Sequence, residues 1–553
     1  MRQFRLPWIR ARKRTAPELP LKAPIQLGAM SNGEVFRPRS ELQAKTEALI
    51  LERAEAGARR LGLDRREFLA SSMGMATSLW AINLATGCGG GDPQQQPGLG
   101  AGATGDGGSP PAGDAGPSAS RGDGGYFTVP DDPADPEAVC ETMLDASQEF
   151  IFDIQTHHVR RANDLYTDFL QDQSHYTQYC GPGALGPVEC FDRNEYVRLM
   201  FLESDTTVAV LSGLPAVSDA ENPITNDEIA ETRDIINMLA DGTQRLINHH
   251  MVLPNQGGTS ADAVAAQLEA MQRTQAVFGS IGAWKCYPAW SPNNSAITAQ
   301  DGWFLDDEAT GIPFIQQGIA LGVDTFCIHK GLPIPAFSTR YNDPRDVGVV
   351  AKRFPQAKFI VYHSGYGNQN AFFEGPYQSG SRRGVDSLIT TLRESEIGPG
   401  SNVFAELGTT WQLVTTTLAF GSLDSAAHLI GKLLLHVGED NVVWGTDSIW
   451  YGSPQAQIEM FLQFEISEAF QQRYGYPALT MERKRKILGR NAARAYDLDV
   501  DAMRCAVTRS ELAAAKRLLD EEAGGRRWAC FEPPLRTRRD FFKFHRRNGY
   551  RPG

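Results

Sequence analysis

One short stretch of the sequence combines an apolar run with side chains that can bind a metal or move protons. Residues 149–159 read EFIFDIQTHHV, so Gln155, His157 and His158 follow directly on an apolar segment. A strand that ends in His-x-His commonly supplies the first two ligands of a hydrolytic metal site. Gln155 stands where the first histidine of that pattern would be. The stretch therefore indicates a metal site with one ligand exchanged, a site that has lost its metal, or an accident of composition.

Further polar residues stand at the ends of other predicted strands, namely Lys285, His329, His363, Glu406 and Asp447. Each alone has a simpler explanation, because a single histidine often makes a structural hydrogen bond and an aspartate often caps a helix. The chain has only ten histidines, however, and three of them fall at predicted strand ends. We therefore expect these residues to form one site.

The elements that must position these residues are eight short apolar runs separated by longer helical patterns. Runs in which the residues of both strand faces are apolar are typical of parallel strands that are buried on both faces. The pattern predicts an α/β fold, a (β/α)8 TIM barrel over residues 145–500, with the catalytic groups at the carboxyl ends of the strands. The third run is the weakest, and His249 and His250 are read as structural residues at its start. The runs lie at 150–155, 207–213, 250–254, 281–287, 324–329, 358–363, 402–407 and 441–447.

The segments before the barrel resemble export elements. Residues 1–63 are predicted to be a disordered N-terminal extension, and 64–88 resembles a twin-arginine signal with Arg65 and Arg66 as the pair. The ending LATGC resembles a lipobox, with Cys88 as the lipid anchor, and the Gly/Pro-rich residues 89–125 predict a flexible tether. These features predict an exported protein, either periplasmic or tethered to a membrane as a lipoprotein. The alternative for 64–88 is an ordinary short core helix.

The C-terminal extension, residues 501–553, begins with a helical pattern and ends in a basic, aromatic tail. A solvated or barrel-packing tail is the preferred interpretation over a patch that binds an anionic partner. The whole chain has a formal net charge of −12 and a pI near 5.4, which argues against general nucleic-acid binding. The expected partner is a small-molecule substrate, without nucleic acid.

The order of the strand-end residues resembles the amidohydrolase superfamily. The details are similar to its second family, which includes aminocarboxymuconate-semialdehyde decarboxylase and related lactone hydrolases. The stretches that carry the resemblance are FDIQTHH, VYHSGYG, VVWGTDS and the closing KILGRNAARAYDL, and it covers roughly 147–498. Members of this family commonly form dimers, so the resemblance also implies a homodimer.

The resemblance implies one divalent metal bound by the positions of Gln155, His157, His329 and Asp447. Zinc is the first expectation and manganese the second, and the exchange to Gln155 leaves a metal-free site open. An amide oxygen is a weaker ligand for zinc than imidazole and suits harder cations. His158 is a poor substitute, because adjacent residues of a strand point to opposite faces.

The resemblance also implies catalytic roles. His363 would orient or deprotonate the attacking water, Asp447 would shuttle a proton, and Lys285 would hold a substrate carboxylate. Trp284, Tyr287 and Glu406 are predicted to line the substrate pocket, although packing at the barrel rim or an ion pair explains them equally well.

Three functions remain open from the sequence. The preferred one is metal-dependent hydrolysis of an ester, lactone or amide-like bond in a small organic acid. Non-oxidative decarboxylation of an aromatic or unsaturated acid uses the same residues and is the alternative. An inactive surface domain that only binds a ligand or partner is the third.

Overall fold

A computed structural model describes the parts of the chain that carry the predicted site. The described residues are 41–61, 64–69, 149–160, 188–217, 221–291, 302–334, 337–416 and 422–507, with single positions at 77, 78, 81, 510, 512, 513, 515, 516 and 518. The chain divides into two compact units, Met1–Ala85 and Thr86–Gly553.

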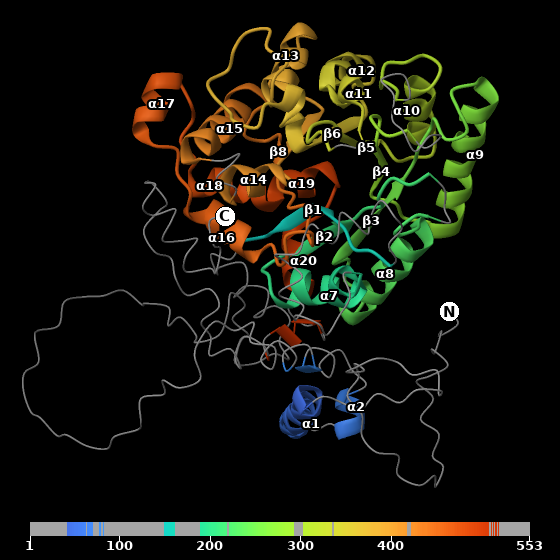
Figure 1. Cartoon of the computed structure of the whole chain (residues 1–553), viewed down its shortest axis with the longest axis vertical. Coiled ribbons are helices and arrows are strands. Elements are labelled where there is room, and N and C mark those ends of the chain that lie inside the picture. Colours follow the sequence, from blue (N-terminus) through green and yellow to red (C-terminus); the bar gives the residue numbers. More distant parts are fainter. Residues whose placement is uncertain are drawn as a thin grey trace, which may run out of the picture. The chain divides into compact units, whose positions relative to one another are not determined.

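Eight parallel strands form the centre of the second unit, in sequence order from β1 to β8. In Figure 1 they lie at the centre of this unit, and the helices lie around them. This arrangement is the predicted (β/α)8 barrel. The strands are β1 (Phe152–Thr156), β2 (Val208–Leu211), β3 (Leu246–Met251), β4 (Ala283–Cys286), β5 (Thr325–His329), β6 (Lys358–Tyr362), β7 (Val403–Glu406) and β8 (Val442–Val443).

The contact between the last strand and the first closes the barrel. β8 is only two residues long, and the chain after it continues the contact with β1. The N–H of Ile154 donates to the Trp444 carbonyl at 3.2 Å, and the N–H of Asp447 donates to the Gln155 carbonyl at 2.8 Å. Thr156 then forms a parallel bridge with Ser448. The segment that carries Asp447 is therefore joined to the strand that carries Gln155.

Helices surround the strands. The long ones begin with side chains that cap their first turn: α8, for example, starts with a capping box between Thr225 and Glu228. The helices of this unit are α7 (Arg193–Val197), α8 (Asn226–Leu239), α9 (Ala261–Phe278), α10 (Gly311–Ala320), α11 (Thr339–Asn342), α12 (Val347–Arg353), α13 (Asp386–Glu394), α14 (Thr410–Thr416), α15 (Leu423–His436), α16 (Gln455–Gln463), α17 (Glu468–Tyr474), α18 (Met481–Arg485), α19 (Asn491–Ala495) and α20 (Val500–Val507).

The barrel interior is packed with side chains from alternate strand residues. The cluster includes Phe152, Ile154, Val208, Val210, Ile247, Cys327, Ile360 and Tyr362, all of them buried. At the amino end of β1, Gly489 lies so close to the main chain that a Cβ on it would be 2.1 Å from the Phe150 carbonyl oxygen. This glycine lets the closing helical segment press against the end of β1. The amino end of the barrel is thus closed by packing, and the predicted site residues lie at the opposite, carboxyl end.

One predicted strand differs from the observed one. The third strand is Leu246–Met251, not 250–254, so His249 and His250 lie inside β3 and not at its start. Both are fully buried, and two adjacent histidines within LINHHM hide the apolar pattern of a strand. The closing stretch of the barrel is a helical run over Met481–Ala495, and it includes a π-helical turn at Lys486–Arg490.

The first unit contains a helix where the sequence was predicted to be disordered. Helix α1 (Glu41–Leu61) lies within the 1–63 extension, and α2 (Arg65–Leu69) contains the arginine pair. Phe68 is buried against Gly57, and Arg65 Nη1 donates to Glu55 Oε2 at 2.5 Å. The prediction of disorder is thus wrong for 41–61, because the residues of α1 and α2 provide contacts for each other.

Several predicted segments lie outside the described residues. These are Cys88, the tether at 89–125 and the basic tail after 518. The predicted helical C-terminal extension starts with α20, and positions 512, 513, 515, 516 and 518 are also helical. Among the helices that the structure describes, none is both long and apolar enough to cross a lipid bilayer.

Candidate active site at the carboxyl end of the barrel

The predicted site residues gather at the carboxyl ends of their strands. Gln155 lies in β1, Lys285 in β4, His329 ends β5 and Glu406 ends β7. His157, His363 and Asp447 follow β1, β6 and β8. Each of these seven residues is less than a tenth exposed. This is the end of a TIM barrel at which active sites form.

His157 and Asp447 form the first pair of the site. Nε2 of His157 lies 3.1 Å from Oδ1 of Asp447, and Nδ1 donates to the Ser212 carbonyl at 2.9 Å. The other carboxylate oxygen, Oδ2, accepts a 2.5 Å hydrogen bond from the Thr409 hydroxyl. Burial alone would raise the pKa of Asp447, but the hydrogen bond and charge of His157 outweigh it and lower that pKa to about 2. Asp447 is therefore a carboxylate at neutral pH.

His329 and His363 form the second pair. Nδ1 of His363 lies 2.7 Å from the Gly408 carbonyl, which can only accept, so this nitrogen carries the hydrogen. Nε2 of His363 then accepts from Nδ1 of His329 at 3.3 Å and faces the Gln155 amide nitrogen at 3.4 Å. This hydrogen-bond arrangement leaves Nε2 of His329 without a hydrogen, so it presents a lone pair. That nitrogen has no hydrogen-bond partner among the described residues.

Glu406 holds the backbone beside His363. Its Oε2 accepts from the His363 N–H at 2.9 Å, and its Oε1 accepts from the Gly408 N–H. Burial raises the pKa of Glu406 well above its usual range. A Cβ on Gly445 would collide with Oε1, so this glycine provides the space for the carboxyl group. In the structure both oxygens serve the main chain, whereas the substrate contact expected from the sequence stays a prediction.

Three residues of the site share an uncommon backbone conformation. His363, Thr409 and Asp447 have φ values of 65°, 54° and 58°. Residues other than glycine rarely adopt this left-handed region, which costs about 1 kcal/mol or more for each. Such strain is often found at functional sites, where the surrounding structure holds it in place. Here it turns the three side chains inward just after their strands end.

Lys285 is a buried amine in the barrel interior. Its Nζ lies 3.6 Å from the centre of the Tyr362 ring and 4.5 Å from that of Tyr287, and it has no hydrogen-bond partner among the described residues. Burial lowers the pKa of Lys285 to about 8, so the cation persists at neutral pH but at a cost. An anionic group of a substrate would relieve that cost.

Aromatic side chains pack against the histidines of both pairs. Trp450 stacks on His157 with ring centres 5.7 Å apart, and Tyr287 lies 5.3 Å from His329. Phe337 meets His329 edge to face at 4.7 Å. Tyr287 thus lies where the sequence placed it, beside the site.

Other predicted neighbours are not part of the site. Trp284 belongs to the core between the barrel and its helices, because it alternates with Lys285 along β4 and points outward. The expectation that it contacts substrate beside Lys285 does not match this position. His158 points away from His157 and bonds to the Thr232 hydroxyl at 3.0 Å, as strand alternation predicts. His249 bonds to Ser212 and Tyr496 in the interior.

The donor atoms fit a cation in chemistry but are not gathered as a preformed centre. Nε2 of His329 and Oε1 of Gln155 are buried acceptors without a partner in the described part of the chain, and Asp447 is a carboxylate. A metal ion or a proton donor would satisfy them. Among the residues that the structure describes, no group of three or more His, Cys, Asp or Glu side chains is placed to hold a metal. The reason is that His329 is hydrogen-bonded to His363, whereas His157 pairs with Asp447.

Sequence reasoning missed two groups that complete the first pair. Thr409 comes three residues after Glu406, beyond the carboxyl end of β7, where a single threonine does not stand out in the sequence. The Ser212 carbonyl has no signal in the sequence, because any residue would provide it. Both determine how Asp447 and His157 are held.

One family model matches part of the chain. Residues 298–498 match the family model described as amidohydrolase, a segment that contains His329, His363, Glu406 and Asp447. No curated protein matches the chain.

Two solved structures are similar to the chain at low identity. An uncharacterized TIM-barrel protein from Bordetella bronchiseptica shares 13% identity, over 62% of this chain and 97% of that one, with a TM-score of 0.41. A uronate isomerase from Bacillus halodurans shares 12%, over 66% and 98%, with a TM-score of 0.34. At these scores neither likeness adds to what the strands themselves show.

Proposed function

Since residues 298–498 match the amidohydrolase family model, we propose that the chain hydrolyses an ester, lactone or amide-like bond in a small organic acid. In this proposal His157, His329 and Asp447 hold one divalent metal, zinc first and manganese second, with the Gln155 oxygen as a weak additional donor. The metal, when bound, supplies polarisation of the scissile carbonyl and acidifies a water molecule.

The observation that supports the proposal most is the unpartnered lone pair of His329. Its Nδ1 is committed to His363, so Nε2 can only accept, and it is buried. A buried acceptor without a partner costs about 1–3 kcal/mol, which a bound cation or substrate donor would recover. His249, a structural histidine inside the barrel, differs from His329 because both of its ring nitrogens have partners.

His363 is arranged to accept a proton. The Gly408 carbonyl and the carboxyl group of Glu406 fix its ring and main chain, and its Nε2 lone pair faces His329 and Gln155. Burial lowers the pKa of His363 to about 4, so it is neutral at pH 7 and able to act as a base. Asp447, held by Thr409, would take part in the return of the proton to the leaving group.

Lys285 would select an acid as the substrate. A carboxylate next to its Nζ would gain a charge-assisted bond in a water-poor interior, where such bonds are strong. The rings of Tyr287 and Phe337 beside His329 would cover the apolar part of the molecule. The substrate class is therefore a small organic acid with an unsaturated or cyclic body.

Metal content of the full-length protein, purified without chelators, tests this proposal. We expect about one zinc or manganese per chain, lost in both His329→Ala and Asp447→Ala. His249→Ala is the matched control, because it removes a buried histidine outside the proposed ligand set. A chain that contains no metal and takes up none on titration contradicts the proposal.

The product then separates hydrolysis from decarboxylation. The buried amine of Lys285 also favours a carboxy-lyase, since it can hold a carboxylate close to the reacting carbon. Incorporation of ¹⁸O from labelled water into the product supports hydrolysis, whereas release of carbon dioxide supports decarboxylation. Tight binding of acids without turnover of any of them would instead indicate a binding domain.

A further inference from the structure

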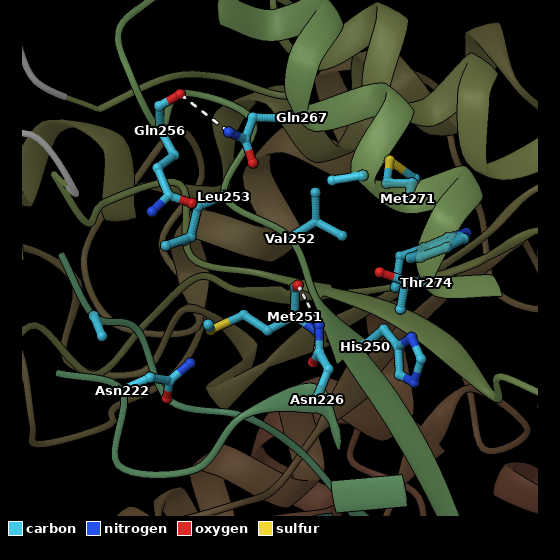
Figure 2. Close-up of a pocket in the computed structure, with 13 residues that line it drawn as sticks. Asn222, Asn226, His250, Met251, Val252, Leu253, Gln256, Gln267, Met271 and Thr274 are labelled. Atoms are coloured by element: carbon cyan, nitrogen blue, oxygen red, sulfur yellow. Dashed lines mark hydrogen bonds between the residues drawn. The ribbon is translucent and has the colours of Figure 1, made fainter. Parts of the chain in front are cut away.

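Two cavities outside the barrel interior differ in the charge of their linings. The cavity in Figure 2, of about 180 Å³ between β3 and the helices α8 and α9, has no Asp, Glu, Lys or Arg side chain in its lining. The other is an open groove of about 620 Å³, formed by the segments that follow β5 and β6. Among the described residues, its lining contains three arginines, Arg340, Arg345 and Arg382, and a single carboxylate, that of Asp343.

Two of the arginines carry a charge that no acidic side chain balances. Arg340 and Arg345 are exposed, and neither forms an ion pair with any residue that the structure describes. Their guanidinium groups lie against the Phe304 ring, with Cζ 5.9 and 4.4 Å from its centre. Two like charges are thus held next to the same ring. An anion from solution is the partner that both can take.

The third arginine and the aspartate are already engaged. Arg382 Nη2 donates to Glu394, and Arg382 Nη1 lies 3.9 Å from Asp343 Oδ1. Asp343 also accepts from the N–H of Arg345 at 3.0 Å and from the Asn368 amide at 3.1 Å. Within the lining, three guanidinium groups therefore stand against one carboxylate that is held by local contacts. This local excess of positive charge contrasts with the formal net charge of −12 of the whole chain.

The buried side chain of Asn368 holds the parts of the groove together. Its amide nitrogen donates to Asp343 Oδ2 at 3.1 Å and to the Arg382 carbonyl at 2.7 Å. Its main-chain carbonyl accepts from the N–H of Gly384 at 3.0 Å. These bonds tie the segment after β5 to both ends of the segment after β6. The groove is therefore formed before a ligand arrives, which lowers the cost of binding.

The rest of the lining is polar and uncharged. Thr339, Gln369 and Asn370 are exposed, and their side chains form no hydrogen bond with the described residues. No aliphatic or aromatic side chain is among the residues that line the groove. Hydroxyl and amide groups can both donate to and accept from the hydroxyls of a ligand. An apolar ligand body would gain little here.

We propose that this groove binds a small phosphate monoester with a hydroxylated body, such as a sugar phosphate. The phosphate oxygens accept from the guanidinium groups of Arg340 and Arg345, and the hydroxyls bond to the amides of Gln369 and Asn370. A phosphate monoester carries a charge of about −1.5 to −2 at pH 7, which suits two unpaired arginines better than a single carboxylate does. This inference is independent of the function proposed for the barrel, because none of the seven site residues lines the groove.

Glucose 6-phosphate is the probe, and inorganic phosphate and glucose are the comparisons. Isothermal titration calorimetry of the full-length protein measures the binding of each. We expect glucose 6-phosphate to bind, inorganic phosphate to bind ~10-fold more weakly, and glucose not to bind. No binding of glucose 6-phosphate at millimolar concentration overturns the proposal, as does equal binding by glucose. Equal binding by inorganic phosphate overturns the assignment of a monoester.

Single substitutions locate the binding. Arg340→Gln and Arg345→Gln should each weaken the binding of glucose 6-phosphate about 10-fold or more, the value of a charge-assisted hydrogen bond. Arg383→Gln is the matched control, because it removes the same charge from an exposed arginine of the same segment that does not line the groove. It should change the affinity less than about twofold, since solvent and salt screen a charge that makes no contact. An equal loss in this control overturns the proposal.

Lys285→Met separates the groove from the barrel site. This variant removes the buried cation of the barrel and should leave the affinity for glucose 6-phosphate unchanged. Loss of binding in Lys285→Met, with none in Arg345→Gln, would place the phosphate inside the barrel and overturn the proposal. The metal content of the wild type, which tests the function proposed for the barrel, has no bearing on this outcome.

Discussion

Nδ1 of His329 lies 3.3 Å from Nε2 of His363, and this hydrogen bond determines the tautomer of His329. The Gly408 carbonyl fixes the hydrogen of His363 on Nδ1. As a result, the lone pair that is left without a partner in these two rings is the one on Nε2 of His329, among the described residues. The consequences of this arrangement can be tested by changing its neighbours one at a time.

Gln155→His should strengthen metal binding. An imidazole would replace the unpartnered amide oxygen with the ligand type that zinc prefers, and we expect at least ~10-fold higher zinc affinity. Competition with a chromophoric chelator measures the change. Gln155→Asn, which keeps an amide, is the control, and an unchanged affinity in Gln155→His would show that this position does not contact the metal.

Thr409→Val should lower kcat about 10-fold or more, because it removes the hydroxyl that bonds Asp447 at 2.5 Å. Valine has the same branched shape, so the left-handed backbone at this position meets no new obstacle. Thr409→Ser retains the hydroxyl and should keep most of the activity. Steady-state kinetics compare the three proteins, and equal loss in the serine variant would point to packing and not to the hydrogen bond.

Lys285→Met should stabilise the protein while removing substrate binding. The folded pKa of about 8 lies below the ordinary value of 10.5, so burial of this cation opposes folding by up to about 3 kcal/mol at pH 7. Urea denaturation measures the change in the free energy of unfolding. The matched control is Lys330→Met, since Lys330 is equally buried but bonds to Asp346 at 2.9 Å and to the Tyr341 carbonyl at 2.7 Å. That variant should lose about 3–5 kcal/mol.

The same lysine predicts a pH dependence. Between about pH 8 and 10.5 the unfolded chain binds more protons at Lys285 than the folded chain does, so the stability of the wild type should rise with pH relative to Lys285→Met. Below pH 8 the difference between the two proteins should be constant. KM for an acidic substrate should increase above pH 8, as the cation is lost. A flat difference across this range would mean that Lys285 titrates normally.

Glu406→Gln should destabilise the barrel by about 1–3 kcal/mol, because the amide nitrogen cannot accept from a backbone N–H. Activity should fall with it, since the His363 main chain loses its support. Glu396→Gln is the control at an exposed position and should leave the free energy of unfolding unchanged within error. Full stability in Glu406→Gln would contradict the role given to this carboxyl group.

We further propose that the arginine pair directs export by the twin-arginine route. Replacement of both Arg65 and Arg66 by lysine keeps the charge and should abolish export while the protein remains in the cytoplasm. Fractionation of cells that express each form measures this. Glu55→Gln removes the partner of Arg65 in α1 and tests whether loss of that contact alone blocks export.

The fold was predictable from the sequence because buried parallel strands are nearly all apolar, as in KFIVY of β6 and VAVL of β2. The third strand was misplaced since His249 and His250 lie within it, and their burial depends on partners from other strands. The eighth strand lies within its predicted range, 441–447, although only two of its residues are regular strand.

The site was predictable in its residue types and not in its hydrogen bonds. His157, His329, His363 and Asp447 stand out because polar residues at the ends of apolar runs must be held by partners. The division into two pairs follows from the tautomers, which depend on the carbonyls of Ser212 and Gly408. No residue type encodes a carbonyl, so this part needed the structure.

The closing contact between β8 and β1 links the integrity of the fold to that of the site. Gln155, His157 and Asp447 lie on the two segments that join there, and the backbone bonds between these segments alternate with the functional side chains. Amide hydrogen exchange along 444–449 should therefore report local opening of the barrel at this seam. Each such opening would separate His157 from Asp447. A ligand that bridges these two residues would therefore stabilise the closed barrel and slow amide exchange at positions that it does not touch.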